Sequence, residues 1–149
     1  MIILDGKKTS ADIKDEIASE VKSITLSGDR PPHLAALIVG NDGASLTYVG
    51  SKVKACEKVG FDSTLLSLPE SISEQELLNK VYELNNDNKI DGYIVQLPLP
   101  EHIDTQKVLM AVDPKKDVDG FHPTNFGKMA LKLPTFISAT PNGLSLIHI

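Results

Sequence analysis

Apolar residues along the chain follow two patterns, short continuous runs and stretches with helical spacing. The runs "MIIL" at 1–4, "HLAALIVG" at 33–40, "STLLSLP" at 63–69 and "DGYIVQL" at 91–97 predict four strands. The second run is apolar throughout, which is typical of a strand that is covered on both faces in a parallel sheet. The pattern therefore favours a mixed fold with buried strands.

Helical spacing fills the segments between these runs. Thr9 with Asp12, and Ser73 with Glu76, resemble capping boxes that start helices, and Gly60 is a good helix stop. The spacing predicts helices over about 10–27, 44–59 and 73–86, and a short helix that ends near Val112.

The alternation of strands and helices, with connections of a few residues, predicts an α/β fold. We expect a three-layer domain whose mainly parallel sheet is flanked by helices, with right-handed crossovers. In such sheets ligands bind beyond the carboxyl ends of the strands. The turn "GNDGAS" at 40–45 and the segment "QLPLP" at 96–100 therefore face one cleft if both preceding strands are central.

Composition and charge narrow the class of protein. A chain of 149 residues, 41% hydrophobic and 23% charged, fits one globular domain. The net charge of -5 and the scattered basic residues argue against nucleic acid, and no apolar run approaches the roughly 18 residues of a membrane span. The N-terminus lacks a signal-peptide layout, and the single Cys56 fits a reducing compartment. We predict a cytoplasmic protein in which Cys56 is a small buried hydrophobe.

One face of the predicted helix 44–59 carries candidate chemistry. Ser45, Tyr48 and Lys52 share this face by spacings of three and four residues. An isolated helical lysine is usually a solvated surface charge, which is our interpretation of Lys54 and Lys58. Lys52 differs because a tyrosine one turn away can position it at the mouth of the sheet, where desolvation favours the neutral amine.

Gln96 has two interpretations from its placement. It can end an apolar strand as a polar residue that is hydrogen-bonded to backbone. Alternatively, its amide can donate and accept beside a substrate or beside Lys52. A neutral amide would not hold a lysine protonated as strongly as a carboxylate would.

The segment "PKKDVDGFHP" places Asp117 and Asp119 two residues apart in an irregular region. An Asp-rich turn is usually only turn chemistry. The letters D-x-D-G also occur in haloacid dehalogenase-type phosphatases, but those need an aliphatic strand directly before the motif, and "DPKK" stands there. The four histidines lack metal-ligand spacing, so we predict no metal and solvated or structural roles for His33, His102, His122 and His148. "VGNDGAS" is no recognised phosphate-binding loop.

Three segments together resemble a known family. "SLTYVGSKVKACEKVG", "DGYIVQLPLP" and "PKKDVDGFHPTNFGKM" are similar to the conserved blocks of the bifunctional methylenetetrahydrofolate dehydrogenase/methenyltetrahydrofolate cyclohydrolase family of bacterial type, and the likeness runs from Met1 to about Gly143. The resemblance implies one-carbon metabolism. The family oxidises 5,10-methylenetetrahydrofolate with NADP and hydrolyses the methenyl product to 10-formyltetrahydrofolate.

The resemblance also implies roles for single residues. Lys52 matches the catalytic lysine, Gln96 its glutamine partner, Tyr48 the tyrosine that orients the folate, and Asp119 the residue that anchors the pterin. A carboxylate suits the parallel N–H donors of a pterin, and hydrolysis of a cationic methenyl carbon suits a partly neutral lysine. The expected catalytic residues are Lys52, Gln96 and Tyr48, and the expected substrate-binding residues are Tyr48, Lys52, Val95, Gln96, Leu97 and Asp119.

Domain organisation follows from the same resemblance. It implies a folate-binding catalytic domain at 1–120, a connection towards an NADP-binding Rossmann domain at 121–143, and a tail at 144–149 that departs from the family's helix and that we interpret as non-native or truncated. The G-x-S-x-x-V-G-x-P motif of that second domain does not occur in the sequence.

Three hypotheses on function follow. The first is that this chain is the folate-binding and catalytic half of such an enzyme, for whose full-length form NADP and a homodimer are expected. The alternatives are an inactive folate-binding or dimerising fragment, and Schiff-base chemistry at Lys52.

Overall fold

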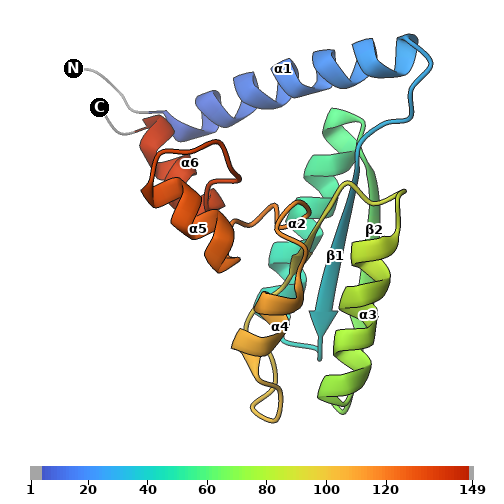
Figure 1. The fold of residues 1–149 in the computed structure, drawn as a ribbon. Coiled ribbons are helices and arrows are strands. Elements are labelled where there is room, and N and C mark those ends of the chain that lie inside the picture. The colour runs from blue at the N-terminus through green and yellow to red at the C-terminus, as the bar shows by residue number, and fades with distance from the viewer. Residues whose placement is uncertain (1–4, 148–149) are drawn as a thin grey trace.

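The computed structural model describes residues 5–147, so the predicted strand at 1–4 and His148 lie outside the described residues. Figure 1 shows the arrangement of the elements. They are α1 (Gly6–Leu26), β1 (His33–Val39), α2 (Gly43–Val59), β2 (Asp62–Leu68), α3 (Glu74–Asn86), β3 (Gly92–Val95), α4 (Thr105–Ala111), α5 (Pro123–Ala130) and α6 (Ala139–Ile147).

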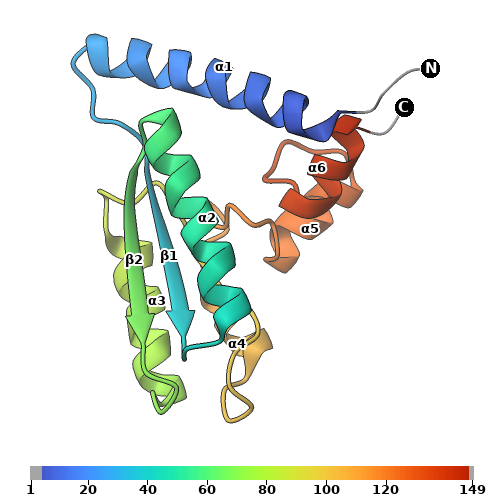
Figure 2. The same ribbon diagram turned by 180° about the vertical axis from the view of Figure 1, so that it is seen from behind.

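The described strands form one parallel sheet in the order β2-β1-β3. β1 is central, with Leu34 opposite Ser63 of β2 and Gly92 of β3. Side chains alternate along β1, so Ala35 and Leu37 join the core shared with α3 and α4, while Ile38 packs on the side of α2. Figure 2 shows α2 across the second face of the sheet. The predicted α/β, three-layer fold is confirmed.

Local caps explain why α2 begins and ends, and why α3 begins, close to the predicted residues. Asp42 accepts a hydrogen bond from the Ser45 N–H at the start of α2, and Gly60 ends that helix in the left-handed conformation, with φ of 82°. Ser73 and Glu76 form the predicted capping box of α3. These signals lie within a few residues of each other, so the sequence alone reveals them.

The predicted start of α1 was wrong. The helix begins at Gly6 because the Asp5 carboxylate accepts from the Lys8 N–H at 3.0 Å. Thr9 lies inside the first turns, where its hydroxyl donates to the Asp5 carbonyl, and Asp12 pairs with Lys8 instead of capping. Figure 1 shows α1 running across one end of the sheet and beyond its edge.

β3 is shorter than the predicted strand 91–97. The Gln96 N–H still donates to the Leu37 carbonyl at 2.8 Å, but the chain then turns through a cis Leu97–Pro98 bond, and a proline has no N–H for the ladder. On the other side of β3, Tyr93 forms a parallel bridge with Asp117. The segment around Asp117 thus continues the sheet at that edge.

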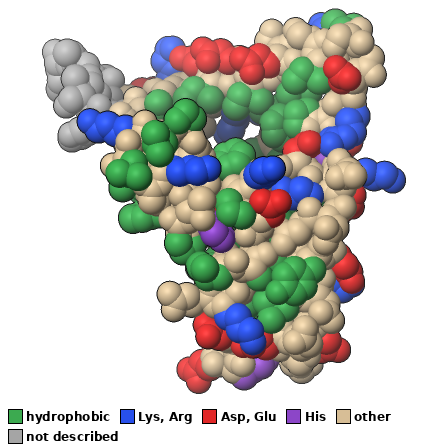
Figure 3. Space-filling model, in the orientation of Figure 1, with side chains coloured by type: hydrophobic (Ala, Val, Ile, Leu, Met, Phe, Trp, Pro, Cys, Tyr) green, Lys and Arg blue, Asp and Glu red, His purple; other side chains and the backbone are tan. Residues whose placement is uncertain are grey.

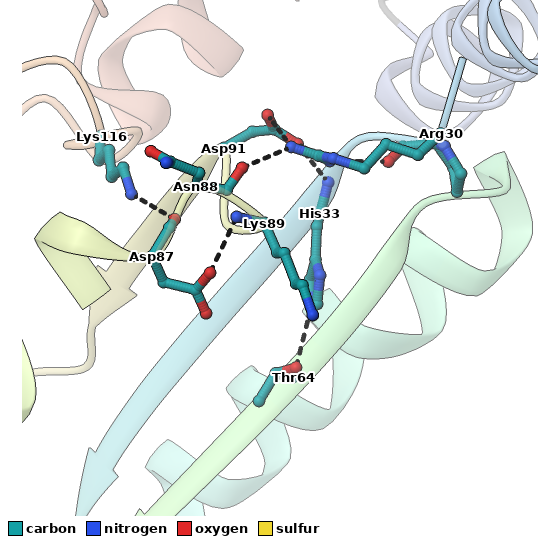
Figure 4. Close-up of polar contacts among 9 residues, drawn as sticks. Arg30, His33, Thr64, Asp87, Asn88, Lys89, Asp91 and Lys116 are labelled. Atoms are coloured by element: carbon teal, nitrogen blue, oxygen red, sulfur yellow. Dashed lines mark hydrogen bonds and ion pairs between the residues drawn. The ribbon is translucent and has the colours of Figure 1, made fainter. Parts of the chain in front are cut away.

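Polar contacts fix the amino ends of β1 and β3 (Figure 4). The Arg30 guanidinium makes two hydrogen bonds with the Asp91 carboxylate, at 2.7 and 2.8 Å, and holds the pKa of that carboxyl below its usual range. Asp91 also accepts from the His33 N–H, and Lys116 donates to the carbonyl of Asp87. These contacts hold the loops at this end together.

Candidate functional site

A small cavity of about 150 Å³ lies between α2, the end of β3 and the segment after Asp117. It contains every site residue predicted from the sequence, namely Tyr48, Lys52, Val95, Gln96, Leu97 and Asp119. Three further residues line it: Phe121, Ala139 and Thr140. The chain therefore brings the predicted residues together from three distant segments, although their roles stay predictions.

α2 positions the first two of these side chains. Tyr48 and Lys52 are one turn apart, so they project from the same side of the helix. The turn at 40–45, which we expected at the cleft, contributes none of the cavity's lining residues. Asp42 is used there to cap α2, and Ser45 is buried in the first turn.

Lys52 lies between an aromatic ring and a carboxylate. Its Nζ is 4.6 Å from the centroid of the Tyr48 ring and 3.7 Å from Asp119 Oδ1. The side chains of Lys52 and Asp119 are only 20% and 17% exposed, so water screens this pair less than a surface pair. A cation over a ring face and beside a carboxylate is held by both contacts.

The charge state of Asp119 is set by opposing effects. Burial raises the pKa of the Asp119 carboxyl, the positive charge of Lys52 lowers it, and the negative charge of Asp117 raises it. Burial outweighs the attraction of Lys52, so the pKa is raised overall. Asp119 is thus a partly desolvated carboxylate whose ionisation depends on its neighbours.

Gln96 fits part of each interpretation. Its side-chain Nε2 donates to the Leu97 carbonyl at 2.7 Å, as expected of a polar residue that ends a strand. The same side chain lines the cavity with Lys52. Among the described residues, the hydrogen bonds do not include one between Gln96 and Lys52, whose ionic partner is Asp119. The loop fixes the amide at the wall of the cavity.

Asp117, which the sequence pattern led us to interpret as ordinary turn chemistry, is a buried residue that accepts hydrogen bonds within its turn. Its carboxylate accepts hydrogen bonds from the backbone N–H groups of Phe121 and His122 and from the side chain of Asn125. Only 5% of the residue is exposed. The donors lie four to eight residues further along the chain, so the sequence pattern of a four-residue turn does not identify them.

A larger apolar groove of about 570 Å³ adjoins the small cavity, between α1, α2 and α6. Ile13, Ile17 and Val59 contribute to its wall, and Lys52 and Asp119 border both spaces. Cys56 also lines it and is buried, which confirms the prediction of a small hydrophobe. Figure 3 shows hydrophobic side chains gathered below α1 and over the α5–α6 segment.

The histidines within 5–147 have structural partners. His33 hydrogen-bonds Thr64, His102 the Ile72 carbonyl, and His122 accepts from the Thr124 N–H at the start of α5. Within the same residues, no group of three or more potential ligands is placed to hold a metal ion. No helix in this part of the chain is both long and apolar enough to cross a bilayer.

Comparison with known proteins identifies the family. Residues 4–119 match the family described as tetrahydrofolate dehydrogenase/cyclohydrolase, catalytic domain. The chain belongs to this family. The resemblance carried by the three sequence blocks is thereby confirmed.

Individual members of the tetrahydrofolate dehydrogenase/cyclohydrolase family are similar along nearly the whole chain. The bifunctional protein FolD of Flavobacterium johnsoniae is 69% identical over 144 residues, which are 97% of this chain and 49% of that protein. The crystal structure of the FolD enzyme of Campylobacter jejuni matches with a TM-score of 0.94 and 42% identity, over 99% of this chain and 52% of that one.

A Trypanosoma brucei family member has been solved with NADP cofactor and an inhibitor. It matches with a TM-score of 0.83 and 32% identity, over 88% of this chain and 44% of that one. The chain thus spans about half the length of the relatives it matches.

Proposed function

We propose that this chain supplies the folate-binding and catalytic half of a methylenetetrahydrofolate dehydrogenase/methenyltetrahydrofolate cyclohydrolase. The whole enzyme would oxidise 5,10-methylenetetrahydrofolate and hydrolyse the methenyl product to 10-formyltetrahydrofolate. The observation that carries the proposal is the single cavity around Lys52, where the Tyr48 ring, the Asp119 carboxylate and the Gln96 amide meet.

Asp119 is proposed to anchor the pterin. The ring N–H and the exocyclic amine of a pterin are parallel donors, and a carboxylate accepts both with its two oxygens. Asp119 is little exposed, so such bonds would form in a partly dry site where they are stronger than in water. Tyr48, which is 52% exposed, offers a ring face for the ligand to lie against.

Lys52 is proposed to move the protons of hydrolysis. Water that attacks the cationic methenyl carbon has to lose protons, and a neutral amine can accept them. When a pterin donates to Asp119, the negative charge beside Lys52 is partly compensated, so the carboxylate holds the ammonium less strongly. Gln96 would orient the water or the amine without adding charge.

The described residues, 5–147, offer no site that fits NADP. Neither a G-x-G-x-x-G nor a Walker sequence occurs in the chain, and the turn "VGNDGAS" leads into α2 with the Asp42 carboxylate at the N-cap, where a phosphate would be repelled. NADP dependence is therefore proposed only for a longer protein with a nucleotide-binding domain.

A second candidate is a fragment that binds folate without turnover. The size of the cavity supports it, because about 150 Å³ is below the roughly 300–1,000 Å³ of typical ligand pockets. Such a space holds part of a folate, and additional walls are needed to enclose the rest. Schiff-base chemistry at Lys52 is a third reading, which borohydride trapping with a carbonyl substrate would reveal.

Calorimetry with 5-formyltetrahydrofolate tests the proposed site. We expect weak but saturable binding, and Asp119→Asn should weaken it about tenfold or more, because the amide turns a donor towards the ligand's donors. Asp29→Asn, at an exposed position before β1, is the matched control and should bind like the unaltered chain. Equal affinities for all three proteins would refute the role of Asp119. Binding without hydrolysis of methenyltetrahydrofolate would favour the inactive fragment.

The cellular setting and the assembly also belong to the proposal. A single buried cysteine is consistent with a cytoplasmic protein. A homodimer is proposed for the full-length form. Sedimentation of that longer protein would test the dimer.

A further inference from the structure

Asp117 is a buried carboxylate for which the proposed chemistry has no use. It lies two residues before Asp119, but it does not line the cavity. Its Oδ2 accepts from the His122 N–H at 2.8 Å and from Asn125 Nδ2 at 2.9 Å, and its Oδ1 accepts from the Phe121 N–H at 3.2 Å. A buried anion requires such compensation, so these donors are an integral part of the fold.

The hydrogen bonds of Asp117 close a turn that presents two cavity residues. Asp119 and Phe121 lie on either side of Gly120, and both line the small cavity. Gly120 has a φ of 70°, and a Cβ there would lie 2.8 Å from the Ser138 N, so only glycine fits. The turn is therefore tight. Two of its backbone N–H groups, those of Phe121 and His122, bind the Asp117 carboxylate.

The backbone on the other side of Asp117 is fixed as well. Asp117 bridges Tyr93 of β3, whose N–H donates to the Lys116 carbonyl at 2.9 Å. Tyr93 is almost fully buried in the main core. Asp117 thus connects a rigid strand to the turn that ends at α5.

We propose that Asp117 is the positioning residue of the site, which holds the turn 117–122 so that Asp119 faces Lys52 and Phe121 walls the cavity. The part of this inference that concerns ligand affinity rests on the proposed folate function, but the part that concerns geometry does not. Asp117 also acts through its charge, because its proximity raises the pKa of Asp119.

The same network offers a matched control. Thr135 donates its hydroxyl to Asn125 Oδ1 at 2.8 Å, at the far end of the hydrogen bonds that start on Asp117. Thr135→Val removes this outer bond and keeps the shape of the side chain. It should lower the melting temperature without moving Asp119 or Lys52. Asp117→Asn keeps the shape of Asp117 but places an NH₂ group against at least one N–H donor.

Proton NMR of the Lys52 ε-methylene group in the 149-residue chain tests the geometry without ligand. Lys52 Nζ lies over the Tyr48 ring, 4.6 Å from its centroid, so we expect the ring to shift the adjoining ε-methylene protons upfield as long as Lys52 stays there, beside Asp119. We expect Asp117→Asn to lose most of this upfield displacement, as the reference variant Asp119→Asn does, whereas Thr135→Val should retain it. A wild-type displacement in folded Asp117→Asn would overturn the proposal, and so would an equal loss in Thr135→Val.

A second variant and a binding measurement also test the positioning role of Asp117. If Asp117→Asn does not fold, Asn125→Ser can replace it, because it removes one of the three hydrogen-bond donors to Asp117. This variant should shift the Lys52 signal in the same direction by a smaller amount. An unchanged signal would contradict the proposal. In calorimetry with 5-formyltetrahydrofolate, Asp117→Asn should weaken binding about tenfold, and unchanged affinity would refute its effect on the site. If the unaltered chain binds no folate, the proposed function fails, while the NMR result still decides the positioning role.

Discussion

The two faces of the sheet are packed differently, and the candidate site lies on the less packed one. Towards α3 and α4, a continuous core joins β1, β3 and both helices, with Leu37 and Leu77 fully buried. Towards α2, the buried side chains that form one cluster are fewer, namely Ala36, Ile38 and Val49. The difference suggests that one face supplies stability and the other presents Tyr48 and Lys52 to a space that further chain or ligand can enter.

The largest expected effect on stability comes from the packed face. Leu77→Ala should lower the free energy of unfolding by about 3 kcal/mol, because it opens a cavity in a close-packed core. Ile13→Ala, in the wall of the open groove, is the matched comparison and should cost about 1 kcal/mol or less, because Ile13 is only half-buried. Urea denaturation measures both, and equal losses would show that the two faces do not differ.

The cap of α3 gives a smaller effect on the same packed face. Ser73→Ala should cost about 1 kcal/mol, because it removes the hydroxyl that accepts from the Glu76 N–H at 3.3 Å. Ser51→Ala, at an exposed position of α2, serves as the control in the same urea series and should change little. A Ser73→Ala chain as stable as the control would contradict the assigned cap.

The less packed face of the sheet, where Asp119 lies, should make the stability of the chain depend on pH. Burial raises the pKa of Asp119 above that of an unfolded aspartate, so the folded chain binds this proton more tightly than the unfolded chain. The contribution of Asp119 to stability is therefore fully present below the unfolded pKa and is lost as pH rises through the raised folded pKa. Asp119→Asn removes this dependence.

Urea titrations from pH 3 to pH 7 check this sign. The stability of Asp119→Asn relative to the unaltered chain should increase with pH across the window above the unfolded pKa and then level off. Asp29→Asn should run parallel to the unaltered chain. A relative stability of Asp119→Asn that falls with rising pH would mean that Lys52, and not burial, dominates the carboxylate.

Local signals explain which parts of the fold were predictable. The caps of α2 and α3 are formed by residues within one turn, so their bounds can be read from the sequence. The start of α1 was misassigned because Asp5 and Thr9 both offer a plausible cap. α5 was not predicted, because its cap is His122, an unusual capping residue that the surrounding turn brings into place.

The site was predictable only in part. Tyr48, Lys52, Gln96 and Asp119 were assigned by family resemblance, and the fold places them at one cavity. The ion pair of Lys52 with Asp119 and the contribution of Phe121 were missed, because 67 residues and a sheet crossover separate Lys52 from its partner. Helical spacing pairs Lys52 with Tyr48, but it carries no information on the turn that Asp117 closes.

The most direct test of the proposed catalytic role of the cavity is the decay of methenyltetrahydrofolate absorbance with the purified chain. The unaltered chain should hydrolyse methenyltetrahydrofolate measurably faster than buffer. Lys52→Ala should lower this rate about a hundredfold or more, as expected for loss of a general base. If the unaltered chain accelerates the reaction by less than that, the rate with Lys52→Ala should fall to the buffer rate. Lys54→Ala, which removes an exposed lysine of the same helix, should retain the full rate. Equal acceleration by Lys52→Ala and the unaltered chain would contradict the catalytic role of the cavity around Lys52.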